Sequence, residues 1–183
     1  MSELPNSQRV EILSESDLGR TISRLASQIL ESVSDVEKLL LIGIPTRGVH
    51  LSNVLAKELE KKTSQQIDHG ILDPTFHRDD LVRIGTRMVQ QTNLPTSVEG
   101  REVVLVDDVI FTGRTVRAAL EALQEWGRAE KTMLLVMVDR GHREVPIQPD
   151  FCGRKVPTRR IESIELRLKN VDSEEGVFLI NNQ

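Results

Sequence analysis

Apolar residues along the chain follow two patterns, a helix period and continuous apolar runs. One set of five recurs at steps of three and four and predicts a helix that begins after Ser14 or Ser16: Leu18, Ile22, Leu25, Ile29 and Val33. Residues 38–44, 102–106 and 131–138 are continuous apolar runs typical of strands covered on both faces. Helical spacing returns after the first two runs. It predicts one helix that buries Leu51, Val54, Leu55 and Leu59 and another over about 115–126.

Strands separated by helices predict the fold class, α/β, with a doubly wound, mainly parallel sheet and helices on both faces. A weaker strand is expected over 65–72, and an excursion without helical period over 73–100, a length common in functional lids. After residue 160, apolar and charged residues alternate, and 177–180 can pair back. A small antiparallel C-terminal element is therefore expected. No repeat or linker interrupts the chain, so residues 1–183 are expected to form a single domain.

Composition excludes several classes of protein. The single Cys152 rules out an intrachain disulfide and a multi-cysteine zinc site. The apolar runs are far shorter than the ~20 residues of a membrane span, and the N-terminus lacks a signal-peptide pattern, so a cytoplasmic protein is expected. A net charge of −4 and five aromatic residues, none of them tyrosine, argue against nucleic-acid binding by bulk charge or by aromatic stacking.

The run from Val103 to Val116 carries the candidate chemistry. A buried strand leads to Asp107 and Asp108, and Thr112 to Thr115 stand at a helix start, where backbone N–H groups suit a phosphate monoester. The two acids would repel that phosphate and instead suit ribose hydroxyls or a developing sugar cation. A lone Asp-Asp pair would more simply be a solvated turn and N-cap.

This run resembles the phosphoribosyl-pyrophosphate (PRPP) signature of type I phosphoribosyltransferases. Four more segments resemble the PyrR family, bifunctional uracil phosphoribosyltransferases that also regulate pyrimidine operons: residues 42–48, 76–81, 138–146 and 153–158. The resemblance implies that uracil and PRPP react to give UMP and pyrophosphate. It also implies the cofactor Mg²⁺, held mainly by PRPP near Asp107 and Asp108 rather than by protein side chains alone.

The resemblance assigns three groups of residues to this reaction. The expected catalytic residues are Asp107, Asp108, Arg47 and Arg78. The expected PRPP-binding residues are Thr46, Arg47, Gly48, Asp107, Asp108, Val109, Ile110, Phe111, Thr112, Gly113, Arg114 and Thr115. Those expected to bind the base are Val138, Asp139, Arg140 and Gly141.

A basic stretch follows at residues 154–160, with four cations and no acid. Such a run is usually a solvated surface. PyrR proteins, however, bind a hairpin of pyrimidine-operon leader mRNA with UMP or UTP as co-regulators, and form homodimers or larger homo-oligomers. The matching positions are Ser23, Arg24, Arg143, Arg154 and Thr158. If the basic stretch and the Arg20/Arg24 helix face meet across a dimer, they form a concave basic surface on an acidic protein.

Some positions depart from the family pattern and leave two alternatives open. Pro74 and His77 alter the excursion loop, and Ser27 and Arg154 alter the RNA positions. One alternative is an RNA-binding, nucleotide-sensing regulator with weak or vestigial catalysis. The other is a purine-salvage phosphoribosyltransferase, because base recognition through main-chain groups leaves little side-chain signature.

Overall fold

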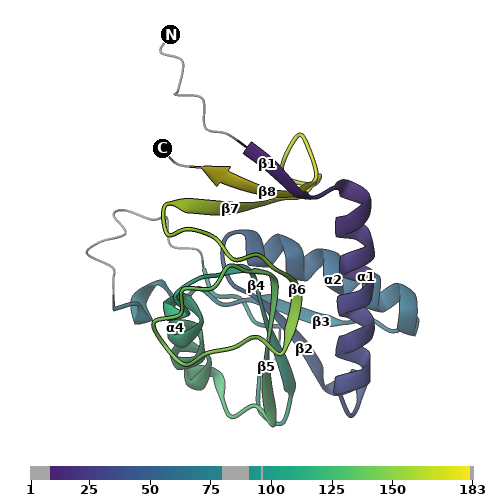
Figure 1. The fold of residues 1–183 in the computed structure, drawn as a ribbon. Coiled ribbons are helices and arrows are strands. Elements are labelled where there is room, and N and C mark those ends of the chain that lie inside the picture. The colour runs from purple at the N-terminus through teal and green to yellow at the C-terminus, as the bar shows by residue number, and fades with distance from the viewer. Residues whose placement is uncertain (1–8, 80–90, 96, 182–183) are drawn as a thin grey trace.

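A five-stranded parallel sheet forms the centre of the structure, a computed structural model that describes residues 9–79, 91–95 and 97–181 (Figure 1). The strand order is β3-β2-β4-β5-β6, and every neighbouring pair is parallel. The strands are β2 (Leu39–Gly43), β3 (Asp68–Ile71), β4 (Glu102–Ile110), β5 (Lys131–Asp139) and β6 (Phe151–Lys155). The predicted parallel sheet is confirmed.

Helices cover both faces of this sheet. They are α1 (Glu15–Ser32), α2 (Arg47–Thr63) and α4 (Arg114–Leu123). Helices α1 and α2 share one apolar core with Leu41, Val104 and Leu135, whereas α4 packs on the opposite face with Val103 and Leu134. Alternate residues of the buried strands therefore serve two cores, which explains why their sequences are apolar throughout. This doubly wound arrangement is the one expected.

A separate three-stranded antiparallel sheet, the hood, lies over one end of the central sheet (Figure 1). Its order is β1-β8-β7, formed by β1 (Arg9–Leu13), β7 (Glu162–Arg167) and β8 (Gly176–Asn181). Strands β7 and β8 are the predicted C-terminal hairpin. Strand β1 was not predicted because most of its residues are exposed and its few apolar positions show no period. Its pairing with β8 supplies the backbone hydrogen bonds that fix it as a strand.

Several element boundaries differ from the prediction. Strand β4 continues to Ile110, whereas a loop was expected from Asp107, because its polar end still pairs with β5. Strand β6 was not predicted, since Phe151 is its only buried residue and pairing with β5 stabilises it. Helix α4 ends at Leu123 and continues as the 3₁₀ turn η3 (Gln124–Trp126).

The excursion after β3 is only partly described. It contains the 3₁₀ turn η2 (Thr75–His77) and a bridge between Ile71 and Asn93. His77 lies 3.5 Å from Glu125, so it packs beside η3. Residues 80–90 and 96 lie outside the described residues, among them Asp80 and Leu81 of a segment that resembles the family. Within the described ranges, none of the helices is long and apolar enough to cross a membrane.

Candidate active site

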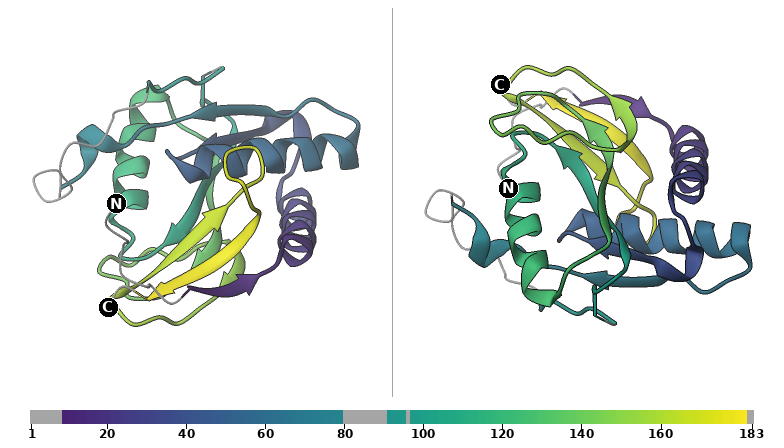
Figure 2. Two further views of the ribbon diagram at one scale, coloured as in Figure 1. Left: turned by 90° about the horizontal axis from the view of Figure 1, so that it is seen from above. Right: turned by 90° about the horizontal axis from the view of Figure 1, so that it is seen from below.

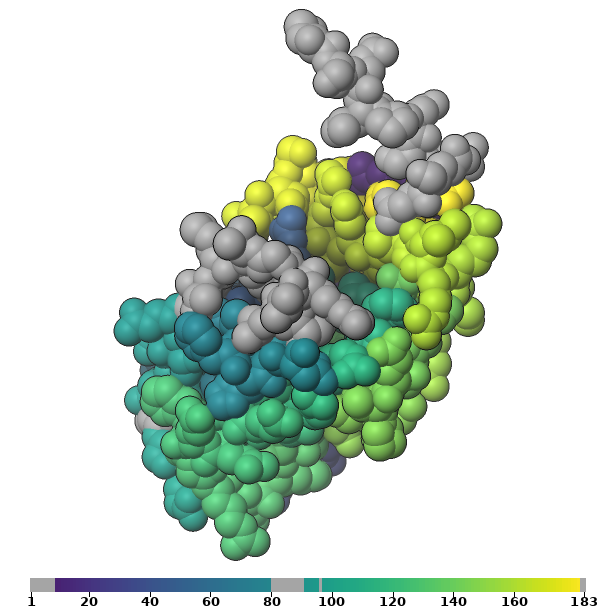
Figure 3. All heavy atoms as spheres, turned by 90° about the vertical axis from the view of Figure 1, so that its left-hand side faces the viewer, coloured from purple at the N-terminus to yellow at the C-terminus, as the bar shows by residue number. Residues whose placement is uncertain are grey.

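The carboxyl ends of β2, β4 and β5 meet at one edge of the sheet because the three strands are parallel and adjacent. The segments that follow them begin at Ile44, Phe111 and Arg140, so the predicted site residues converge on this edge. Figure 3 shows the molecule from one side, where the surface is hollowed between the hood in yellow and the sheet-bearing part in teal and green.

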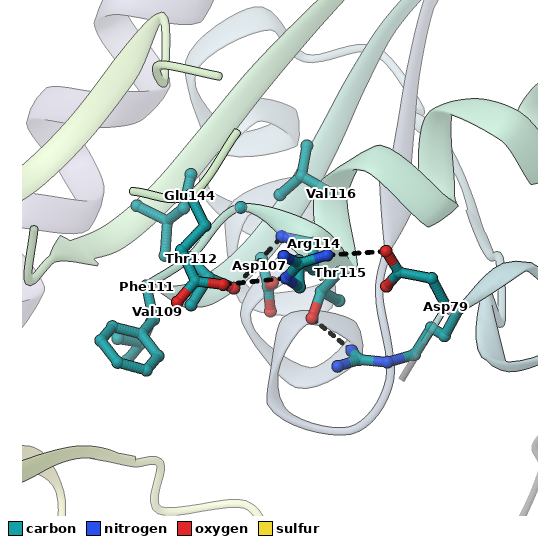
Figure 4. A pocket seen from close by; sticks show the side chains of 12 residues that line it. Asp79, Asp107, Val109, Phe111, Thr112, Arg114, Thr115, Val116 and Glu144 are labelled. Carbon is teal, nitrogen blue, oxygen red and sulfur yellow. Dashed lines mark hydrogen bonds and ion pairs between the residues drawn. The ribbon is translucent and has the colours of Figure 1, made fainter. Parts of the chain in front are cut away.

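A cavity of about 540 Å³ lies where β4 passes into α4 (Figure 4). Asp107 and every predicted residue from Val109 to Thr115 line it. Gly113, the N-cap of α4, has a φ of 88°, a left-handed conformation that glycine adopts without strain. The turn presents backbone N–H groups and the Thr112 and Thr115 hydroxyls beside the positive end of the helix dipole, which suits an anion.

Charged side chains from other segments complete this cavity. Arg78 donates a hydrogen bond to the Thr115 hydroxyl. Arg114 pairs with Asp79 at 2.7 Å and with Glu144 at 2.9 Å, and the dashed lines of Figure 4 mark both contacts. The hydrogen bond to Arg114 lowers the pKa of the Glu144 carboxyl. Sequence reasoning missed Asp79 and Glu144 as lining residues, although both fall within segments that resemble the family.

The two adjacent acids lie at the end of β4 in different environments. Asp107 is buried and lines the cavity, and its Oδ1 accepts a hydrogen bond from the Asp108 N–H at 2.9 Å. Burial raises the pKa of the Asp108 carboxyl, opposed by a hydrogen bond with Asp107 and by the charge of Arg47. The structure thus brings Arg47 into electrostatic reach of Asp108, so the segments after β2 and β4 form one site.

The segment after β2 begins α2. Thr46 is its N-cap, and the peptide bond between Pro45 and Thr46 is cis. Gly48 packs so closely on β4 that a Cβ atom there would lie 2.4 Å from the Val106 carbonyl oxygen. Arg47 makes a two-pronged ion pair with Asp172 of the hood, with nitrogen–oxygen distances of 2.5 and 2.8 Å. No local pattern in the sequence predicts this partner.

A second cavity of about 310 Å³ lies at the ends of β5 and β6. Asp139, Arg140 and Gly141 line it as predicted for the base, whereas Val138 is fully buried in the core. Sequence reasoning did not assign its other lining residues to the base site: His142, Lys155, Pro157 and Thr158.

Phe111 connects the two cavities. It lines the first cavity, and the Arg140 guanidinium lies 4.1 Å from its ring centroid. Arg140 Nε also donates to the Thr158 hydroxyl at 3.0 Å. Burial lowers the pKa of Arg140. The contact between Phe111 and Arg140 therefore links the linings of the two cavities.

The residues predicted to contact RNA separate into two groups. Arg24 and Arg154 line a shallow hollow of about 420 Å³ together with Arg20, and Ser23 precedes Arg24 on α1. Arg24 donates to the Gly153 carbonyl oxygen at 2.7 Å, so the Arg20/Arg24 face and the start of the basic stretch meet within one chain. A meeting of these surfaces across a dimer stays a prediction.

Arg143 and Thr158 lie elsewhere, beside the second cavity. Arg143 pairs with Asp139 at 2.7 Å and donates to the Phe111 carbonyl oxygen at 2.9 Å, with only 13% of its side chain exposed. Its guanidinium is thus committed to the interior. Ser27, a departure from the family pattern, donates its hydroxyl to the Ser23 carbonyl oxygen within α1.

Comparison with known proteins identifies the family. The phosphoribosyl transferase domain model matches residues 9–164. A bifunctional protein PyrR from Microcystis aeruginosa is 50% identical over 94% of this chain and 98% of its own. One from Mycobacterium bovis is 44% identical over 92% of both chains. A hypoxanthine phosphoribosyltransferase structure from Staphylococcus aureus has a TM-score of 0.68 at 18% identity, covering 97% of this chain and 96% of its own, which shows the fold. The chain belongs to the phosphoribosyltransferase family and, within it, to the bifunctional PyrR proteins.

Proposed function

We propose that the protein is a uracil phosphoribosyltransferase that also binds pyrimidine-operon leader mRNA. The observation that carries the enzymatic part is the cavity at the end of β4, where an anion-binding helix start lies beside two carboxylates. The relatives at 44–50% identity are bifunctional PyrR proteins, and it is the resemblance to this family that implies uracil as the acceptor of the phosphoribosyl group. In the reaction, N1 of uracil forms the bond to C1 of the ribose as pyrophosphate leaves, and UMP is the product.

The 5′-phosphate and the ribose hydroxyls of PRPP would each be bound by a different set of protein groups. The turn from Thr112 to Thr115 binds the 5′-phosphate through N–H groups, hydroxyls and the helix dipole. Asp107 and Asp108 accept hydrogen bonds from the ribose hydroxyls, and their charge stabilises positive charge that develops on the sugar. Catalysis of this kind needs positioning and charge stabilisation and no covalent nucleophile.

The segment from Thr46 to Gly48 would bind the leaving pyrophosphate. Arg47 supplies positive charge, and Gly48 lets the backbone lie close to the end of β4. Arg78, which reaches Thr115 from the excursion, is placed to cover the sugar and exclude water.

The residues present fit Mg²⁺ bound mainly through PRPP oxygens. Across residues 9–79, 91–95 and 97–181, no three His, Cys, Asp or Glu side chains gather into a metal site. Asp107, which lines the phosphate cavity, and the adjacent Asp108 would contact the bound ion. When bound, Mg²⁺ neutralises charge on the leaving pyrophosphate.

Uracil is proposed to occupy the second cavity. The base would lie beside Asp139, Arg140 and Gly141, which line this cavity, whereas the Val138 side chain is buried in the core. Phe111 lies between this cavity and the ribose acids. UMP would then span both cavities.

The RNA-binding part of the proposal rests on the hollow formed by Arg20, Arg24 and Arg154. All three arginines are exposed, although Arg20 pairs with Asp17 at 2.6 Å and Arg24 and Arg154 donate to backbone carbonyl oxygens. RNA phosphates, which supply most of the affinity in RNA binding, would contact their exposed guanidinium groups. Lys155 and Thr158 line the second cavity, and Arg154 precedes Lys155 on the same segment. A nucleotide in that cavity would therefore contact the segment that bears Arg154, which supports control by UMP or UTP. We also propose that the protein forms a homodimer or a larger homo-oligomer. We propose a cytoplasmic location, because mRNA is available there.

The enzymatic proposal is tested by assaying pyrophosphate release from PRPP with uracil, hypoxanthine and guanine. Turnover with uracil is expected, and Asp107→Asn combined with Asp108→Asn should abolish it. Turnover confined to the purines would replace uracil phosphoribosyl transfer with purine salvage. Failure with every base, alongside retained RNA binding, would leave a nucleotide-sensing regulator.

The RNA proposal is tested by a gel shift on the leader of a pyrimidine operon, with and without UMP. UMP should strengthen binding, and Arg154→Ala should weaken it. Arg128→Ala is the matched control, because Arg128 is also an exposed arginine and lies outside the hollow. Affinity that ignores both UMP and Arg154→Ala would rule out this surface.

A further inference from the structure

We propose that Asp172 competes with the diphosphate of PRPP for Arg47 and so sets the affinity of the enzyme for PRPP and pyrophosphate. This inference rests on the proposed function, since it takes Arg47 as the cation for the leaving group. Asp172 belongs to the turn between β7 and β8, 125 residues away in sequence. Figure 2 shows this yellow turn beside α2, whose first residue is Arg47.

The geometry of the contact is the one by which arginine also binds phosphate. Both terminal nitrogens of Arg47 donate to the two carboxylate oxygens of Asp172, at 2.5 and 2.8 Å. A guanidinium presents the same planar fork to a carboxylate and to a phosphate. A diphosphate that takes this edge of Arg47 must therefore displace Asp172.

Asp172 is held in place independently of Arg47. Its Oδ2 accepts a hydrogen bond from the Leu168 N–H at 2.9 Å, and its own N–H donates to the Leu168 carbonyl oxygen at 2.8 Å. The turn thus presents a preorganised carboxylate. Only 15% of the Asp172 side chain is exposed, so water screens the pair less than it screens an ordinary surface ion pair.

Two carboxylates near Arg47, those of Asp172 and Asp108, repel an incoming diphosphate. The hydrogen bond from Arg47 lowers the pKa of Asp172, which keeps this carboxylate ionised at neutral pH. Asp108 also lies within electrostatic reach of Arg47. Asp172 therefore adds a negative charge at the place where the pyrophosphate would carry several, and it occupies the donors that would offset them.

The test is Asp172→Asn, which keeps the shape and the acceptor for the Leu168 N–H while it removes the charge. The KM for PRPP and the Kd for magnesium pyrophosphate, measured by calorimetry, should each fall about five- to tenfold, because a neutral hydrogen bond replaces a charge-assisted one. The value of kcat should change much less, since Asp172 does not contact the reacting atoms in this mechanism.

Glu174→Gln is the matched control. Glu174 lies in the same turn and carries the same charge, but it pairs with Arg9 and Arg167 at 2.6 Å each. It should leave both constants unchanged if competition for Arg47, and not net charge, sets the affinity. Asp172→Ser, whose hydroxyl can still accept from Leu168, serves as the second variant if Asp172→Asn fails to fold.

Three results separate the possibilities. Equal or weaker pyrophosphate binding in a folded Asp172 variant would overturn the inference, because an orienting role for Asp172 predicts weaker binding. Tighter pyrophosphate binding without uracil turnover by the unchanged chain would support the competition and overturn the proposed base. A wild-type protein that binds neither PRPP nor pyrophosphate would overturn both.

Discussion

Gly48→Ala should lower the rate of the reaction because it displaces the backbone at the start of α2. The size of this displacement can be worked out from the structure. The added Cβ would lie 2.4 Å from the Val106 carbonyl oxygen and 3.1 Å from the Asp107 Cα. Real Cβ atoms essentially never approach within 3.0 Å of such a neighbour. Because both neighbours are backbone of β4, no side chain can rotate away, and the start of α2 must move.

The displacement would change the distance between the two parts of the proposed site, the start of α2 and the end of β4. The required shift is about 0.6–1 Å, and a misplacement of about 1 Å can cost roughly 100-fold in rate. Arg47 would move relative to Asp107, so kcat/KM for PRPP should fall by about that factor. Overpacking a core contact of this kind costs about 1–3 kcal/mol of stability.

The assay compares uracil-dependent pyrophosphate release and thermal melting in Gly48→Ala and Gly19→Ala. Gly19 is an exposed residue of α1 with nothing within 4 Å of its added Cβ. Gly19→Ala should retain full activity and gain about 1 kcal/mol, the helix-propensity difference. If Gly48→Ala stays within about threefold of wild type in kcat/KM, the close packing of α2 on β4 does not position the site and the reasoning fails.

Two further predictions concern buried charge. Arg143→Met should cost about 3–5 kcal/mol in urea unfolding, because it leaves the Asp139 carboxylate, whose side chain is 10% exposed, without its ion-pair partner; a cost below about 1 kcal/mol would contradict it. Arg47 lowers the folded-state pKa of Asp172 below the usual 3.8, so its stabilisation is present above that pH and is lost on further acidification. The melting-temperature difference between wild type and Asp172→Asn should accordingly shrink as the pH falls below about 3.8. A difference that stays constant with pH would refute this prediction.

Local patterns were sufficient for the central sheet and for the phosphate turn. The runs that form β2, β4 and β5 are apolar because each strand is buried on both faces. A continuous apolar run therefore predicts such a strand from the sequence. The run from Asp107 to Thr115 is contiguous, so its residues had to lie together at the end of β4. The parallel order then explains why the segment of Arg47 lies near Asp108.

Only the tertiary structure decided the features that join distant segments. Strands β1 and β6 have weak local patterns, and each exists because a neighbouring strand supplies its hydrogen bonds. Asp172 meets Arg47 across 125 residues, and Arg143 turns inward because Asp139 and Phe111 provide its partners. Local periodicity reports how a segment is buried, but it does not report which polar side chain another segment brings to it. The fold class and the phosphate turn thus follow from local patterns, whereas the contact of Asp172 with Arg47 depends on long-range pairing that no local pattern encodes.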